Sequence, residues 1–163
     1  MATGNSLCFF HPQDNEPPAS NYATLDSRNN HFCLDLDTTT HEAAIFTGIL
    51  PRTYAGGGIT VYVHYAMTSA TSGTCGWDVA FERIGDSQQD IDSDSFATAQ
   101  TITAVTVPAT SGHVDIVNVA VTDGANMDSI AVGETFRLRI RRDVANDNGA
   151  GDSELVGVEL KET

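Results

Sequence analysis

The chain has 163 residues, 40% of them hydrophobic and 18% charged, and its 22 acidic against 8 basic side chains give a formal net charge of −14. This length suffices for the core of one domain without disulfides. The negative charge disfavours direct binding to nucleic acid or to an anionic membrane, because a surface of the same sign repels both. Abundant small and hydroxylated residues favour a β protein.

The cysteines and the N-terminal residues indicate the compartment. Cys8, Cys33 and Cys75 are odd in number and follow no CxxC or Cys/His metal spacing, so we interpret them as reduced core thiols. The first residues lack a basic start and contain only a short apolar run, which argues against a signal peptide or a membrane span. We therefore expect a protein made and folded in a cytosol.

Residues 1–40 differ from the rest of the chain. Pro12, Pro17 and Pro18 interrupt them, and their apolar residues come in brief clusters. Proline removes a backbone donor and breaks helices. We interpret this segment as an extended N-terminal arm with short strands, including an edge strand over residues 31–36, with Tyr22 anchoring the loop before it. Residues 41–163 then form the domain proper.

Residues 42–50 predict a core strand, and residues 57–83 predict two long antiparallel strands joined by a polar loop. The two runs within residues 57–83 alternate between apolar and other residues with the period of a strand that buries one face, whereas residues 42–50 are almost continuously apolar. A sugar-stacking platform of Trp77 with Tyr62 and Tyr65 is conceivable. Trp77 shares its face with Val79 and Phe81, however, so core packing is preferred, and Tyr62 is the better exposed aromatic residue.

Four further strands are expected over residues 98–107, 114–122, 134–142 and 154–161. In the second of these the apolar alternation slips, which predicts a β-bulge near Ile116. In the last, Val156, Val158 and Leu160 are expected on one face. About eight strands without a convincing long helix predict an all-β fold, an antiparallel two-sheet β-sandwich of jelly-roll-like type.

An acidic loop over residues 85–95 is a candidate cation site. Alternating carboxylates suit Ca²⁺, and Asp86 lies nearby; the alternating residues are Asp90, Asp92 and Asp94. The EF-hand pattern fails, because Ser95 and Thr101 stand where it needs Gly and Glu. A solvated loop is the preferred interpretation, and a bound Ca²⁺ is the alternative.

One strand face concentrates basic residues in this acidic chain, namely Arg137, Arg139 and Arg141. A stripe that binds phosphate or nucleic acid is one interpretation. The preferred one is pairing with carboxylates on neighbouring strands, or with the acidic surface of a second subunit, because opposite charges stabilise cross-strand positions. The candidate partners within the chain are Asp78, Glu82 and Glu159.

No catalytic motif stands out. The histidines His11, His31, His41, His64 and His113 form no HxH or HExxH pattern, and no serine lies in a GxSxG turn. The three glycines at 56–58 lack the lysine and the helix of a nucleotide-binding loop. The chain is therefore not expected to be an enzyme.

Several longer segments together resemble a group of small single-domain virion proteins of tailed bacteriophages. They are PRTYAGGGITVYVHY (51–65), SATSG (69–73), DSDSFATAQ (92–100), VPATSG (107–112), GETFRLRIRRD (133–143) and GDSELVGVELK (151–161). The similarity extends to EPPASNYATLDSRN (16–29) in the predicted arm. These motifs specify strands and turns rather than chemistry.

The resemblance implies a jelly-roll-like head decoration or cement protein that binds the capsid surface as an oligomer, most plausibly a homotrimer, with the major capsid protein as partner. It implies a location on the virion, after assembly in the host cytoplasm. The arm, with Pro12, Pro17, Pro18 and Tyr22, is then expected to contact a neighbouring subunit or the shell. The face of Arg137, Arg139 and Arg141 is a second expected interface. The alternative is a receptor-binding or fibre-tip domain that recognises a host glycan.

Overall fold

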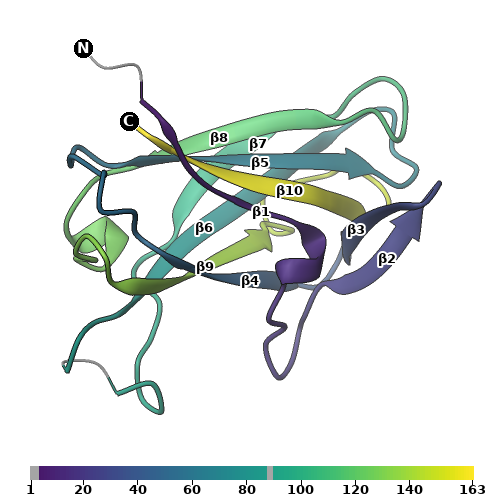
Figure 1. Ribbon diagram of the computed structural model, residues 1–163. Coiled ribbons are helices and arrows are strands. Elements are labelled where there is room, and N and C mark those ends of the chain that lie inside the picture. The colour runs from purple at the N-terminus through teal and green to yellow at the C-terminus, as the bar shows by residue number, and fades with distance from the viewer. Residues whose placement is uncertain (1–3, 88–89) are drawn as a thin grey trace.

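The computed structural model describes residues 4–87 and 90–163, so residues 1–3 of the predicted arm and 88–89 of the acidic loop lie outside it. Two antiparallel sheets pack face to face and confirm the predicted jelly-roll-like β-sandwich (Figure 1). The described residues form ten strands rather than about eight. Within these residues, no helix combines the length and apolarity needed to cross a membrane.

The larger sheet has six strands in the order β2-β3-β10-β5-β8, with β1 also paired to β10. Its strands are β1 (Ser6–Phe10), β2 (Thr24–Arg28), β3 (His31–Leu36), β5 (Ile59–Met67), β8 (Asp115–Val121) and β10 (Ser153–Glu162). The smaller sheet has four strands in the order β4-β9-β6-β7. They are β4 (Ala43–Ile49), β6 (Thr74–Ile84), β7 (Gln100–Thr106) and β9 (Thr135–Arg142); two short 3₁₀ helices are η1 (Pro12–Asp14) and η2 (Ala125–Met127).

The core lies between the two sheets, where the alternation in β5 and β6 directs apolar side chains. Val61, Val63 and Tyr65 of β5 are fully buried, and so is Trp77 of β6. The rings of Tyr65 and Trp77 pack edge to face with centroids 5.3 Å apart, the geometry that aromatic pairs prefer. Trp77 is therefore a core residue, as the alternation predicts.

Residues 6–36 contribute three strands to the larger sheet, whereas the sequence interpretation places them in an extended arm outside the sandwich. β1 and β3 both pair with the same edge of β10, each along a different part, and β2 pairs with β3. Phe10, Leu34 and Leu36 lie in the core. The prolines do not prevent this, because they lie outside the strands, in η1 and in the loop after it.

The predicted β-bulge near Ile116 is wrong. The register between β5 and β8 runs without a shift from Ile59 opposite Val121 to Tyr65 opposite Asp115. Strand β8 turns Val117 and Val121 toward the core, whereas Val114 and Ile116 are each about half exposed. The apparent slip in the alternation arises because these two apolar side chains lie outside the core.

A bulge occurs instead in β10, between Leu155 and Gly157. The extra residue reverses the alternation, so Leu155 and Val158 both face the core and Val156 does not, contrary to the prediction. A side chain at Gly157 would place its Cβ 2.7 Å from Cζ of Phe9. The bulge and this glycine together let β1 lie close against β10.

Candidate functional site

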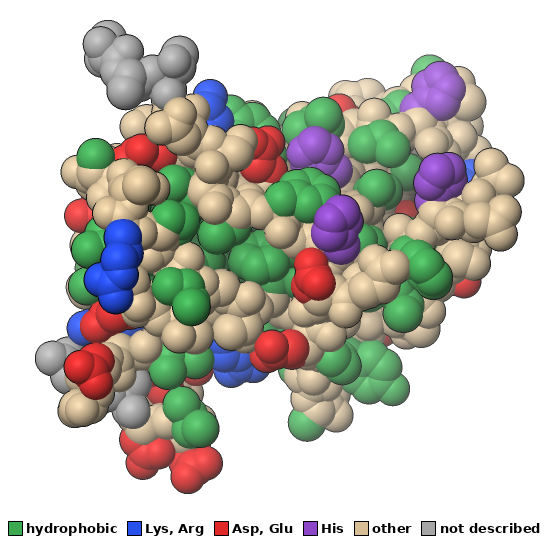
Figure 2. All heavy atoms as spheres, in the orientation of Figure 1, with side chains coloured by type: hydrophobic (Ala, Val, Ile, Leu, Met, Phe, Trp, Pro, Cys, Tyr) green, Lys and Arg blue, Asp and Glu red, His purple; other side chains and the backbone are tan. Residues whose placement is uncertain are grey.

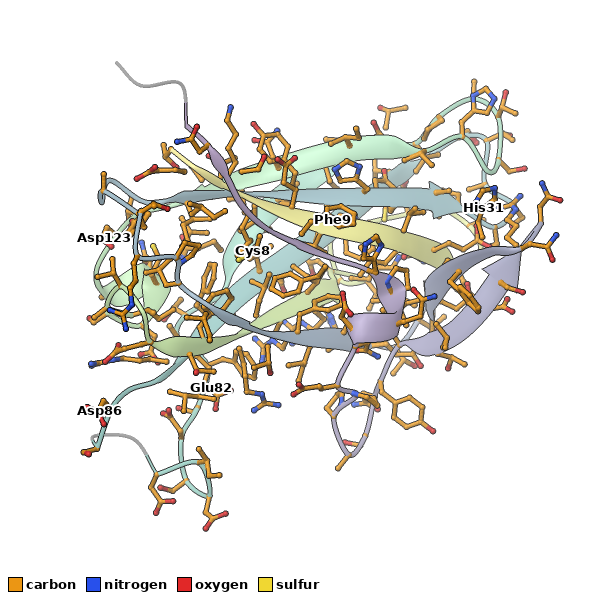
Figure 3. The ribbon with its side chains drawn as sticks, viewed as in Figure 1. Cys8, Phe9, His31, Glu82, Asp86 and Asp123 are labelled. Atoms are coloured by element: carbon orange, nitrogen blue, oxygen red, sulfur yellow. The ribbon has the colours of Figure 1, made fainter. Side chains whose placement is uncertain are left out.

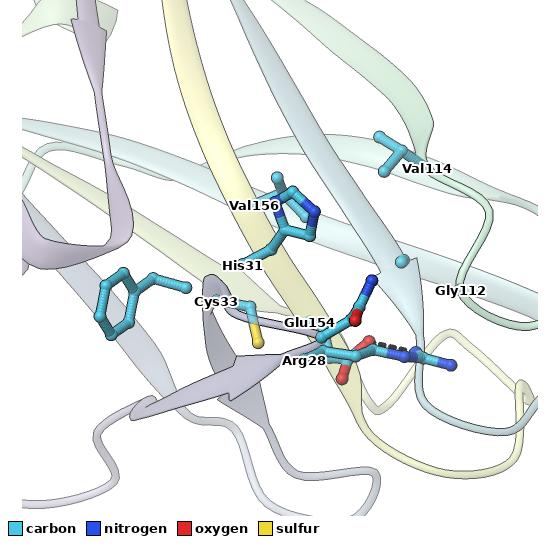
Figure 4. A pocket seen from close by; sticks show the side chains of 10 residues that line it. Arg28, His31, Cys33, Gly112, Val114, Glu154 and Val156 are labelled. Carbon is cyan, nitrogen blue, oxygen red and sulfur yellow. Dashed lines mark hydrogen bonds and ion pairs between the residues drawn. The ribbon is translucent and has the colours of Figure 1, made fainter.

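A hollow of about 400 Å³ lies over the larger sheet on the side away from the core. Strands β3, β10 and β5 form its floor, and the turn between β2 and β3 and the loop before β8 form its walls (Figure 4). Its lining includes Arg28, His31, Phe32, Cys33, Glu154 and Val156. The bulge in β10 brings Val156 to this floor.

The alternation of β3 places chemically active side chains on the outer face. Leu34 and Leu36 point into the core, so His31, Cys33 and Asp35 share the opposite side of the strand. Across the ladder, Glu154 of β10 lies directly opposite Asp35. Two carboxylates thus occupy adjacent positions on one face, an arrangement that like charges disfavour.

An ion pair spans the wall and the floor of the hollow. Arg28 Nη1 lies 2.5 Å from Glu154 Oε2 and also donates a hydrogen bond of 3.0 Å to the carbonyl of Met67. The Arg28 side chain is 40% exposed, whereas that of Glu154 is 7% exposed. The carboxylate is therefore held in place below the surface, and the guanidinium reaches it from solvent.

Asp35 has no such partner. Its Oδ1 atom is buried and forms no hydrogen bond within the described chain. Burial, followed by the charge of Glu154, raises the pKa of Asp35 to about 6. The same two causes raise the pKa of the neighbouring Cys33 thiol to about 11. The outer face of β3 and β10 is thus a cluster of negative and potentially negative groups with one nearby guanidinium.

Exposed apolar side chains surround the hollow. Phe9, Phe32, Val114 and Ile116 are each about half exposed. The Phe9 ring packs edge to face on His11, with centroids 4.7 Å apart, and faces His64 at 6.5 Å. Figure 2 shows histidine side chains lying among hydrophobic ones on this side of the molecule. We call this surface, from Phe9 to the hollow, the apolar face.

The acidic loop projects from the opposite end of the molecule, where Figure 3 labels Asp86. The backbone N–H of Asp92 donates to Asp90 Oδ1 at 3.0 Å, and that of Ser95 donates to Asp94 Oδ1 at 2.8 Å. Among the described residues, Asp90, Asp92 and Asp94 do not gather their carboxylates as metal ligands within 4.8 Å of one another. Calcium binding in this loop stays a prediction.

The basic strand face pairs as expected at two of its three positions. Arg137 Nη1 lies 2.8 Å from Glu82, and Arg141 Nη2 lies 2.6 Å from Asp78. Arg139 instead covers the ring of Phe96, 4.9 Å from its centroid. Burial lowers the pKa of Arg139. Glu82 belongs to the smaller sheet, whereas Phe9 and His31 lie over the larger one (Figure 3).

The residues expected at an interface differ in exposure and border two hollows. Pro12 is buried, and Pro18 is half-buried; Pro17 and Tyr22 are exposed. Pro12 and Tyr22 border a shallow hollow of about 290 Å³, and Pro18 borders another of about 210 Å³ together with Arg139 and Arg141. Contact of these residues with a second subunit stays a prediction.

The sequence interpretation missed the cluster on β3 and β10. Cys33 was assigned to the core, yet it lies outside the core cluster even though it is buried. The signal was the H-x-C-x-D spacing over residues 31–35, which puts three potential ligands on one face of a strand. Their fourth neighbour, Glu154, is 119 positions beyond Asp35, and no local pattern connects them.

The chain matches no protein-family model, and a search of curated proteins finds no significant match. Solved structures share its fold. The chain aligns over 94% of its length with a Paenibacillus sp. cycloisomaltooligosaccharide glucanotransferase complexed with cycloisomaltoheptaose, at 13% identity and a TM-score of 0.51, and covers 18% of that chain. It aligns over 98% of its length with an exo-β-1,3-galactanase from Phanerochaete chrysosporium with galactose, at 13% identity and a TM-score of 0.51, and covers 30% of that chain. At these identities the likeness establishes the β-sandwich fold alone.

Proposed function

We propose that this protein is a non-catalytic structural component of a tailed-phage virion, a decoration or cement protein that binds the outer surface of the head as an oligomer. The proposed partner is the major capsid protein, and the proposed assembly is a homotrimer. Two features support this: the sequence motifs shared with small phage virion proteins, and the apolar face. The apolar face is the observation that carries the proposal.

The apolar face is the surface best suited to a protein partner. In a chain with a net charge of −14, most surface interactions with an acidic partner are repulsive, so attachment needs apolar contact or local positive charge. Phe9, Phe32 and Ile116 are each about half exposed around the larger sheet, and exposed apolar groups that cluster mark interaction sites. Burying a large apolar side chain fully gains about 1.5–3 kcal/mol, so completing the burial of several gives useful affinity.

Asp35 and Glu154 are two neighbouring carboxylates, as a glycoside hydrolase requires, but their burial argues against catalysis of hydrolysis. Asp35 and Glu154 place carboxylate oxygens within 4.8 Å of each other, and a glycoside hydrolase also uses two carboxylates. Glu154 is only 5% exposed and is bound to Arg28, and Oδ1 of Asp35 is buried. A glycosidic bond needs access to both groups, so a non-catalytic role is favoured.

The direct test is binding of the purified protein to phage heads prepared without it, measured by co-sedimentation. Phe32→Ser and Ile116→Ser should each weaken binding by about tenfold or more, the change that about 1.4 kcal/mol produces. Ile91→Ser is the matched control, because Ile91 is 76% exposed but lies on the acidic loop away from the apolar face. Equal loss in all three variants, or in none, contradicts the proposal.

A second candidate is recognition of a host glycan by a receptor-binding domain. The hollow favours it, because an apolar floor bordered by polar groups such as Arg28 and His31 is typical of small-ligand sites. Sugar-acting enzymes also contain domains with this fold. A glycan array with the full chain tests this candidate, since selective binding that Phe32→Ser abolishes supports glycan recognition over decoration.

A further inference from the structure

We propose that Cys33, Asp35 and Glu154 form a binding site for a divalent transition-metal ion of the Zn²⁺ type, with His31 as a fourth ligand. This inference does not rest on the proposed virion function. It rests on the geometry, burial and charge of four side chains on the outer face of β3 and β10.

The three central ligands are already close together. Cys33 Sγ and one carboxylate oxygen each from Asp35 and Glu154 all lie within 4.8 Å of one another, the only such group in the described chain. Zinc binds sulfur at about 2.3 Å and oxygen at about 2.0–2.2 Å, so tetrahedral ligands stand roughly 3.3–3.7 Å apart. Side-chain rotations that close the triangle by about 1 Å therefore suffice.

The thiol is buried, and a neighbouring carboxylate oxygen is unpartnered. Cys33 is 3% exposed, and the buried Oδ1 of Asp35 forms no hydrogen bond with the described residues. Unpartnered buried polar atoms are costly. Cys33 Sγ and a carboxylate oxygen of Asp35 lie within 4.8 Å of each other, so one metal ion could bind the thiolate and the Asp35 carboxylate together.

The local charge also calls for a cation. Asp26 of β2 lies opposite Cys33 in the ladder, and Asp35 lies opposite Glu154, so negative groups surround the thiol on both sides. Arg28 supplies one positive charge and binds only Glu154 among them. A dication between Cys33, Asp35 and Glu154 reduces the repulsion that burial of these groups creates.

The ligand types select the metal. A thiolate favours zinc and similar soft or borderline ions, whereas Ca²⁺ prefers six to eight oxygen ligands. His31 stands two residues before Cys33 on the same side of β3 and is exposed within the hollow (Figure 4). Its imidazole is free to turn toward the ion and complete a Cys, His and carboxylate set of the kind that binds zinc.

Arg28 is the competing cation. Its guanidinium holds Oε2 of Glu154 at 2.5 Å (Figure 4), and its side chain is 40% exposed. The metal ion would replace this guanidinium as the partner of the buried carboxylate, so the two cations compete for Glu154. Removing the guanidinium should therefore strengthen metal binding, an effect opposite to that of removing a ligand.

Titration of the full-length protein with Co²⁺ after chelator treatment tests the site, because thiolate-bound Co²⁺ absorbs in the near ultraviolet by charge transfer. One equivalent should produce this band, and Zn²⁺ should displace Co²⁺ and abolish it. Cys33→Ser should lose the band, and Cys8→Ser, the matched control at a half-buried thiol elsewhere, should keep it. Arg28→Gln should lower the dissociation constant.

Asp35→Asn provides a second test in case Cys33→Ser does not fold. Loss of a residue that only supports a ligand lowers metal affinity by about 10- to 100-fold. Asp35→Asn removes a ligand itself, so it should weaken Co²⁺ binding by more than this, while circular dichroism shows an intact sandwich. A missing charge-transfer band in the wild-type protein overturns the proposal. So does a band that survives Cys33→Ser or Asp35→Asn with unchanged affinity.

Discussion

Single ion pairs stabilise the loops of this sandwich. One of them joins Arg83 of β6 to Glu134, the residue before β9. Arg83 donates to both carboxylate oxygens of Glu134, at 2.6 Å each, and the N–H of Ala131 donates to the same carboxylate at 2.8 Å. These hydrogen bonds, Arg83 first, lower the pKa of Glu134 from 4.5 to about 2. The charged form of Glu134 is thus favoured in the folded protein.

Glu134→Gln should therefore destabilise the protein at neutral pH but not in strong acid. A depressed pKa in the folded state stabilises the protein fully above the unfolded value of 4.5, and the benefit is lost as pH falls toward 2. The melting temperature of the variant should lie below that of the wild type at pH 7, and the gap should close between about pH 4.5 and pH 2. A gap independent of pH contradicts this account.

The burial and the partners of individual side chains are the features least predictable from the sequence. Alternation correctly placed Trp77 in the core, because burial in a strand follows local sequence. It did not reveal Arg142, which is fully buried and paired with Asp147, because a charged residue is expected outside unless its partner is known. The cluster around Cys33 is not predictable for a similar reason, since Glu154 is brought next to Asp35 only by the pairing of β10 with β3.

At the scale of elements, β10 organises the larger sheet. It pairs with β5 on one edge and with both β1 and β3 on the other. The alternation predicts strand β10 but not the bulge that turns Val156 outward. The bulge lies next to Gly157, which has no side chain and so gives no sign of the face on which it lies. Two partners of β10, strands β1 and β3, lie more than a hundred positions before it in the sequence. Local patterns do not encode such distant pairings.

Gly157→Ala tests how closely β1 packs on β10. The new Cβ would lie 2.7 Å from Cζ of Phe9, so the half-exposed phenyl ring must rotate away into a less favourable rotamer, at a cost of about 0.5–1.5 kcal/mol. Urea denaturation measures the change in free energy of unfolding. Gly76→Ala is the matched control, because its Cβ meets its nearest neighbour at 3.4 Å; an equal loss in both variants contradicts the packing account.

A chain that begins at residue 41 should not fold. It lacks β1, β2 and β3, so the edge of β10 loses its partners and the core loses Phe10, Leu34 and Leu36. This replaces the expectation that residues 41–163 by themselves form the domain proper. Cooperative thermal unfolding of the truncated chain, measured by circular dichroism, would show that the arm is dispensable and the structural account wrong.

At the scale of the whole molecule, the fold class is predictable from the sequence and the proposed binding surface is not. Regular alternation, prolines in turns and the lack of long helical patterns sufficed for a two-sheet sandwich. The apolar face is built from residues of β1, β3 and β8 and the loop before β8, which alternation assigned to an arm or to the core. Only the sheet order brings them together.

The proposal that this chain decorates a phage head is tested most directly by electron cryomicroscopy of phage particles to which the purified protein has been added. The account predicts density for the β-sandwich on the outside of the head, with the apolar face of Phe9, Phe32 and Ile116 against the major capsid protein and with subunits grouped in threes. Density at the tail tip, or a sandwich on the head whose apolar face points to solvent, would contradict it.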